Sequence, residues 1–134
     1  LDKHYYVTNF VVAIVLLLIG GLPMVLWGIF LRTVVAWHAT WLVNSATHLW
    51  GKRRFETRDD SRNNGWVAAL TFGEGWHNNH HAYPRSSRHG LTWREIDVNW
   101  IQIRMLEMLG LVKDVYSYDL ADEDIYAREI KKAA

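Results

Sequence analysis

Hydrophobic and polar positions divide this chain into two parts near Gly51. From Tyr5 to Gly51 only Arg32 carries a formal charge, and no polar face recurs at helical spacing. Helices of soluble proteins nearly always have such a face, whereas a helix of about 20 apolar residues can cross a membrane. We therefore predict that residues 1–50 form a transmembrane helical hairpin, with spans over about residues 6–26 and 29–50.

Two segments could hold the turn of this hairpin: residues 20–23, which read Gly-Gly-Leu-Pro, or Trp27 with Gly28. We predict the turn at Trp27 and Gly28, because this leaves about 20 residues on either side. Pro23 would then kink the end of the first helix, which membrane helices tolerate. Residues 52–54 are all basic, so the positive-inside rule predicts that both ends of the chain are cytosolic.

The part beyond the hairpin, residues 51–134, is predicted to be a small cytosolic cap of helices. Residues 51–65 are polar and rich in turn formers, which is typical of a surface loop. Residues 92–95 have the form of a capping box that opens a helix, and Gly110 suits its C-terminal cap. Residues 114–134 alternate acidic and basic groups and are predicted to form a loosely attached helix. The predicted fold class is therefore all-α.

Composition and charge exclude several classes of function. Nucleic-acid binding usually needs a clustered basic face, and the formal net charge of +1 gives no case for it, so we predict no nucleic-acid partner. The sequence has no cysteine, and therefore no disulfide framework and no thiolate metal or haem site. Seven histidines and eight tryptophans are conspicuous, and the histidines are the candidates for chemistry.

Three histidines form the pattern H-x-x-H-H at His77, His80 and His81. On a helix, His80 lies about 60° behind His77 and His81 about 40° ahead of it, so the three imidazoles share one face and Asn78 and Asn79 take the other. Imidazoles crowded on one turn repel one another when protonated, unless a metal ion binds their lone pairs. We predict a metal site here. The spacing is compatible with Zn, Fe, Cu or Ni, and it leaves coordination positions for other residues.

His48 is the candidate ligand from another segment. At helical rise it lies about 6 Å before the charged boundary at Lys52, and Asn44 is one turn earlier on the same face. Polar side chains at this depth are costly unless they have a role. His48 could instead face lipid headgroups, but beside the H-x-x-H-H segment we favour the ligand. His38 is read as a hydrogen-bonded packing residue, and Glu74 as either an acceptor that orients an imidazole or an exposed loop acid.

Three stretches of the sequence carry a resemblance to a known family. They read HATWLVNSATH over residues 38–48, GEGWHNNHH over residues 73–81 and SSRHGLTWREID over residues 86–97. Together they resemble the C-terminal half of membrane fatty acid desaturases, in particular the Δ9 acyl desaturases of the stearoyl-CoA type. The similarity is greatest to the acyl-lipid form of cyanobacteria and plastids.

This resemblance implies a di-iron centre and an oxidation that uses O2. By resemblance, His77, His80 and His81 form a histidine box that ligates the two Fe ions, His48 is an additional ligand, and Asn44 reaches an iron through water. No catalytic residue is implied beyond this metal site. The family inserts a cis double bond at carbon 9 of a saturated acyl chain, carried by an acyl lipid or by CoA. Its electrons come from ferredoxin or a small b-type cytochrome. Removing hydrogen from an unactivated methylene requires a strongly oxidising centre, which favours iron over zinc.

The sequence departs from the family pattern because further histidine boxes are missing. The family also has an H-x-x-x-x-H box and a second H-x-x-H-H box upstream, whereas this sequence has no histidine pair at that first spacing and a single H-x-x-H-H. The chain therefore resembles a fragment of a four-helix membrane di-iron desaturase, an integral multi-pass protein of a bacterial plasma or thylakoid membrane. We expect it to be inactive alone and to need the N-terminal half of the desaturase as a partner.

Two other functions stay open. A membrane fatty acyl hydroxylase could use a similar histidine box, although we associate the NSATH segment with the Δ9 desaturases. A non-catalytic membrane metal- or haem-binding module is the alternative from a different class. Cofactors in helical bundles are usually held from facing helices, and three histidines on one turn fit a haem poorly.

Overall fold

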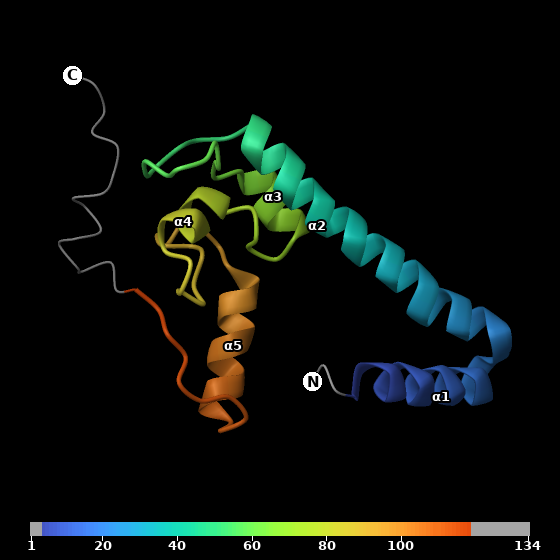
Figure 1. The fold of residues 1–134 in the computed structure, drawn as a ribbon. Coiled ribbons are helices and arrows are strands. Elements are labelled where there is room, and N and C mark those ends of the chain that lie inside the picture. Colours follow the sequence, from blue (N-terminus) through green and yellow to red (C-terminus); the bar gives the residue numbers. More distant parts are fainter. Residues whose placement is uncertain (1–3, 119–134) are drawn as a thin grey trace, which may run out of the picture. The chain divides into compact units, whose positions relative to one another are not determined.

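The structure is a computed structural model, and it describes residues 4–118. Over these residues the chain is helical and contains isolated β-bridges without a strand, so the all-α class is confirmed for this part. The helices in chain order are α1 (Tyr5–Val25), the π-helix η2 (Leu26–Leu31), α2 (Arg32–Leu49), α3 (Gly65–Leu70), α4 (His77–Ala82) and α5 (Val98–Met108). Figure 1 labels the α-helices. The chain divides into two compact units, with the boundary between Ala39 and Thr40.

The helical backbone of the first unit is broken at Gly20 and Gly21, and the prediction of a turn at Trp27 and Gly28 is wrong. Gly21 has φ 68° and ψ −163°, and Gly20 is also non-helical. This backbone region is essentially restricted to glycine, so the Gly-Gly pair supplies the bend (Figure 1). Pro23 therefore falls in the first turn of the next helical piece, where its missing N–H costs little. Trp27 and Gly28 lie within η2.

Apolar side chains of the first unit are largely exposed. Helix α1 has no buried residue, and the exposed fractions of Tyr6 and Leu18 reach 84% and 80%. Among the described residues, Tyr5–Leu49 is the one helical stretch long and apolar enough to cross a membrane, with a mean hydropathy of 2.7. Exposed apolar helices of this length are expected where lipid replaces water as the solvent.

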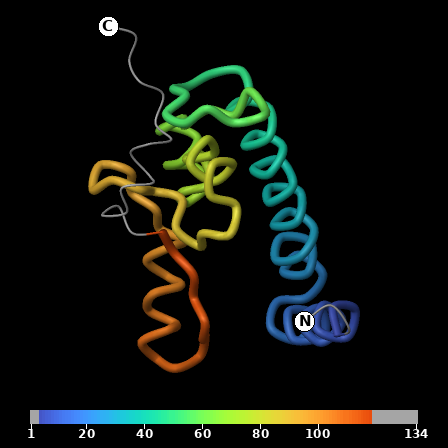
Figure 2. Tube along the Cα trace, turned by 60° about the vertical axis from the view of Figure 1, so that its left-hand side comes forward, coloured from blue at the N-terminus to red at the C-terminus, as the bar shows by residue number. Residues whose placement is uncertain are grey.

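Within residues 40–118, the second unit contains two small apolar cores. The first joins the end of α2 to α3 and consists of Val43, Ala46 and Val67. The second lies between loops and the end of α4 and consists of Phe55, Tyr83 and Leu91. After α5 the chain reverses at Gly110, whose φ is 70°, and runs back along the helix (Figure 2). There the Ser87 N–H donates to the carbonyl of Tyr116 at 2.8 Å.

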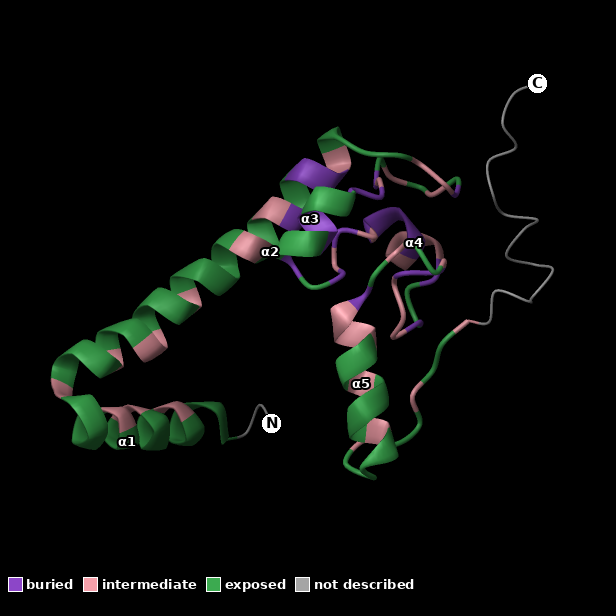
Figure 3. Ribbon diagram, turned by 180° about the vertical axis from the view of Figure 1, so that it is seen from behind, coloured by how far each residue is buried: buried purple, intermediate pink, exposed green. Residues whose placement is uncertain are grey.

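Residues 51–65, predicted as a surface loop, lie partly inside the second unit. Phe55 and Ser61 are fully buried, and Asn63 and Asn64 are buried as well. Figure 3 shows short buried segments, in purple, in the loop between α2 and α3. Asn64 also caps α3, because its side chain accepts a hydrogen bond from the Val67 N–H. Polar residues that indicate turns in the sequence are used here as caps and internal partners, and they hold the loop against the histidine-bearing helix.

Helix α5 begins later than the predicted capping box. Oε2 of Glu95 does accept from the Thr92 N–H at 2.9 Å, but it closes only a turn. Asp97 is the actual N-cap, accepting from the Trp100 N–H at 2.9 Å. The Glu95 carboxylate is also held by the Leu91 N–H at 2.8 Å, which ties it to the loop. The C-terminal cap at Gly110 is confirmed by its positive φ. Residues 114–118 are not helical, and the rest of the predicted tail helix lies outside the described residues.

Candidate metal centre

Asn78 fastens the histidine-bearing helix α4 to the preceding loop. Its Oδ1 accepts from the N–H groups of Arg54 and Phe55, each at 2.7 Å, and its Nδ2 donates to the carbonyl of Phe55 at 3.0 Å. The side chain of Asn78 is fully buried. The first x of the H-x-x-H-H motif is therefore an internal anchor of the helix.

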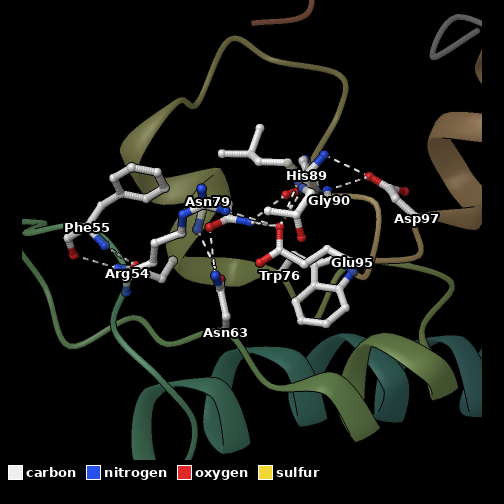
Figure 4. Close-up of polar contacts among 12 residues, drawn as sticks. Arg54, Phe55, Asn63, Trp76, Asn79, His89, Gly90, Glu95 and Asp97 are labelled. Carbon is white, nitrogen blue, oxygen red and sulfur yellow. Dashed lines mark hydrogen bonds and ion pairs between the residues drawn. The ribbon is translucent and has the colours of Figure 1, made fainter. Parts of the chain in front are cut away.

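Asn79 fastens the same helix to two further segments (Figure 4). Its Oδ1 accepts from Nδ2 of Asn63 at 2.6 Å, and its own N–H donates to Oδ1 of Asn63 at 3.1 Å. Its Nδ2 donates to the carbonyl of His89 at 2.8 Å and to Oε2 of Glu95 at 3.2 Å. Because both amides of the motif lie on the side away from the histidines, α4 is held from one face and presents imidazoles on another.

Three imidazoles, one from the end of α2 and two from α4, converge. His48, His77 and His81 each offer a ring nitrogen, and these nitrogens all lie within 4.8 Å of one another. Nε2 of His81 is 3.0 Å from Nε2 of His77, and the ring centroid of His48 is 5.2 Å from that of His77. Imidazole nitrogens are common ligands of Zn, Cu, Fe and Ni, so this histidine cluster could hold a metal ion.

Electrostatics keep His77 neutral in the metal-free cluster. Burial, together with the neighbouring His81, His48 and His80, lowers the pKa of His77 to about 4. The residue therefore carries a free lone pair at pH 7, which metal ligation requires.

A carboxylate lies behind the cluster at Asp59. Its Oδ2 is 2.5 Å from Nδ1 of His81, and its Oδ1 accepts from the Ser61 N–H at 3.0 Å. Burial acts to raise the pKa of Asp59, but hydrogen bonds from Ser61 and His81 hold it well below its usual range. The sequence pattern does not identify Asp59 as part of the site. An Asp two positions before a Ser in a polar loop indicates an Asx turn, which involves one carboxylate oxygen. The pattern does not predict that the other oxygen contacts His81.

His80 lies at the edge of the histidine cluster, nearest to His89. Its ring centroid is 4.5 Å from that of His89, 5.5 Å from that of His81 and 6.0 Å from that of His77. Its Nδ1 is buried with no hydrogen-bond partner among the described residues, and burial followed by the neighbouring His89 lowers its pKa. A buried imidazole nitrogen without a partner suits a ligand position outside the three-histidine cluster.

Glu74 contacts an imidazole, that of His89. Its Oε2 is 3.6 Å from Nδ1 of His89, and its Oε1 accepts from Nδ2 of Asn99 at 2.7 Å. Of the two readings of Glu74, contact with an imidazole therefore describes the structure better than an unattached loop acid.

The remaining sequence candidates lie outside the cluster. Asn44 is exposed, and its Nδ2 donates to the carbonyl of Thr40 at 2.9 Å. Nδ1 of His38 lies 2.8 Å from the carbonyl of Val34, within the helix, which agrees with a hydrogen-bonded residue.

Comparison with known proteins gives consistent matches. Residues 3–98 match the family model described as fatty acid desaturase. The chain is 58% identical over 102 residues to an sn-1 stearoyl-lipid 9-desaturase of Synechocystis sp., and 51% identical over 117 residues to an sn-2 palmitoyl-lipid 9-desaturase of Nostoc sp.. It is 50% identical over 115 residues to a chloroplastic palmitoyl-monogalactosyldiacylglycerol delta-7 desaturase of Arabidopsis thaliana. These alignments cover 76%, 87% and 86% of this chain but 32%, 41% and 31% of the relatives. The chain thus spans less than half the length of the curated relatives it matches.

Proposed function

The chain belongs to the fatty acid desaturase family, and on that premise we propose that it is the C-terminal part of an O2-dependent acyl desaturase. The proposed reaction inserts a cis double bond at carbon 9 of a saturated acyl chain. The observation that carries this proposal is the convergence of His48, His77 and His81 within 4.8 Å. The names of the cyanobacterial relatives, which are lipid 9-desaturases, support the acyl lipid as substrate and the position of the double bond.

We propose that residues 1–50 form a transmembrane hairpin whose bend is at Gly20 and Gly21, and that residues 51–134 form a cytosolic cap. The exposed apolar side chains of the first unit and the basic residues 52–54 support this arrangement. Residues 23–49 would be about 40 Å long at helical rise, more than the hydrocarbon core of about 30 Å. The last turn of α2, with His48, would then reach the cytosolic surface. Both chain ends would be cytosolic, in a bacterial plasma or thylakoid membrane.

We propose that the histidines hold a di-iron centre. His48, His77 and His81 are assigned to one iron because their ring nitrogens converge. His80 is assigned to the other because its ring lies nearest to that of His89 and its buried Nδ1 has no hydrogen-bond partner among the described residues. Asn44 would act through water. When bound, iron would supply with O2 the oxidising power that an unactivated methylene requires. The role of this chain is to hold the imidazoles in place from behind.

We propose that the remaining ligands come from an N-terminal part of the desaturase. Four histidines are too few for two irons, since each ion takes about four or more ligands. Electrons would come from ferredoxin or a small b-type cytochrome. The chain alone is then expected to be inactive.

A chimera tests this function directly. This chain would replace the matching segment of the Synechocystis relative, and lipid fatty acids and purified protein would be analysed. The expected result is a monounsaturated product and about two irons per chimera, both lost in the variant His77→Ala and retained in His38→Ala. Stoichiometric zinc or haem on the 134-residue chain alone, with no iron on the chimera, would overturn the proposal and favour a self-contained binding module.

A further inference from the structure

We propose that Asp59 is a positioning residue of the metal centre, which fixes the tautomer and the ring orientation of His81. The inference rests on the proposed function, because it concerns the same site. Oδ2 of Asp59 lies 2.5 Å from Nδ1 of His81, and Nε2 of His81 faces Nε2 of His77 at 3.0 Å. One imidazole nitrogen is thus occupied by a carboxylate, and the other points into the cluster.

The chemistry of this contact determines where the proton of His81 lies. An ionised carboxylate only accepts hydrogen bonds, so Nδ1 must carry the proton. In a neutral imidazole the other nitrogen then has the lone pair, and Nε2 is the ligating atom. Carboxylate–histidine contacts of this kind orient metal ligands and raise their basicity, and losing one typically weakens metal binding about 10–100-fold.

The carboxylate itself is held before any metal binds. Its Oδ1 accepts from the Ser61 N–H at 3.0 Å and from the Thr57 hydroxyl at 3.2 Å. Ser61 is fully buried, and its Oγ is 3.1 Å from Oγ1 of Thr57. One oxygen of Asp59 is therefore fixed by the loop, which leaves the second oxygen directed at His81.

Asn78 connects the loop to the helix that carries His81. Its hydrogen bonds with Phe55 join residues 51–65 to α4, and its Nδ2 also reaches Oγ of Ser61 at 3.4 Å. Asn78 thus contacts Ser61, which holds the Asp59 carboxylate, and it belongs to α4, the helix that carries His81. Asp59 and His81 can then keep their relative position without the ion.

The neighbouring acid is a matched control. Asp60 has the same charge and the next position in the chain, but its carboxylate is 79% exposed and contacts Arg53 at 3.7 Å. Exposed ion pairs of this kind contribute little to stability. A substitution there removes the same charge without touching His81.

The variant Asp59→Asn changes the contact with little change of shape. Oδ1 of the amide can still accept from Ser61 and Thr57, which leaves Nδ2, a donor, facing Nδ1 of His81. This arrangement favours the tautomer with the proton on Nε2, which cannot ligate. In the metal-free 134-residue chain in micelles, histidine 15N spectra should show the Nδ1–H form of His81 in the original sequence and in Asp60→Asn, and the Nε2–H form in Asp59→Asn. The His81 signals are identified by their loss in His81→Ala.

Binding of Co2+ to the chimera measures the consequence for the metal. Asp59→Asn should weaken Co2+ binding about 10–100-fold, whereas Asp60→Asn should stay within about twofold of the original. An Nε2–H form of His81 in the unaltered chain would overturn the inference without any variant, and so would unchanged Co2+ affinity in Asp59→Asn. A chimera that binds no metal while the tautomers behave as expected would instead overturn the proposed function and leave the Asp59–His81 assignment standing.

Discussion

Replacing Asn78 with alanine should destabilise the second unit by several kcal/mol. Asn78 is fully buried and holds both the N–H and the carbonyl of Phe55, which is itself fully buried. A buried backbone group left without a partner costs about 1–3 kcal/mol, so the loss of these two contacts predicts about 2–6 kcal/mol. Total domain stabilities are about 5–15 kcal/mol, so this variant should lose a large part of the fold.

The measurement is urea unfolding of the chain in detergent, followed by tryptophan fluorescence, together with hydrogen exchange of residues 51–65. Asn78→Ala should lower the unfolding midpoint and speed the exchange of the Phe55 amide. The control Gln102→Ala removes an exposed amide on α5 and should change the free energy of unfolding by about 0.5 kcal/mol or less. An Asn78→Ala protein as stable as this control would show that water replaces the anchor. Helix α4 would then not be held by its asparagine face.

Further predictions concern the metal, pH and the turn. His48→Ala should lose most metal from the chimera, measured by elemental analysis, while His38→Ala, outside the cluster, should retain it. Metal-free chain should lose thermal stability as pH falls from about 6.5 to about 4, because the folded pKa of His77 is lowered from 6.5 to about 4 and the unfolded state takes up the proton first. His77→Gln should remove this part of the pH dependence, and an unchanged profile would contradict the assignment. Gly21→Ala should destabilise the first unit by about 1–3 kcal/mol, seen in its melting temperature in bicelles, because φ is positive there.

Hydrophobic patterning predicted the helices but not the bend between them. Counting about 20 residues per span favoured Trp27 and Gly28, whereas the structure bends at the Gly-Gly pair. The count treats all positions as equal, but only glycine readily adopts the φ and ψ of Gly21. Pro23, taken as a late kink, instead opens the following helical piece. Turn chemistry was the more informative signal here, because a π-helix can continue through Trp27 and Gly28 without a break.

Helical geometry predicted which imidazoles share a turn, but not how they divide. It placed His77, His80 and His81 on one face, and the structure groups His77 and His81 with His48 while His80 lies beside His89. His80 and His81 lie on either side of His77 on the helix, so they can contact different residues. Those residues, His89 and His48, come from other segments of the chain. Asp59 could not be predicted for the same reason, since its contact with His81 depends on how the loop folds back onto α4.

The two asparagines explain how so short a helix can hold its histidines in place. Helix α4 has six residues, and isolated helices shorter than about 12–15 residues are marginal in water. Its shape must therefore come from tertiary contacts, and Asn78 and Asn79 supply them on the face opposite the imidazoles. A helix held this way cannot shift without breaking buried amide contacts, so the backbone positions of the histidines are set before any metal binds. The x positions of the motif thus help to place the proposed ligands.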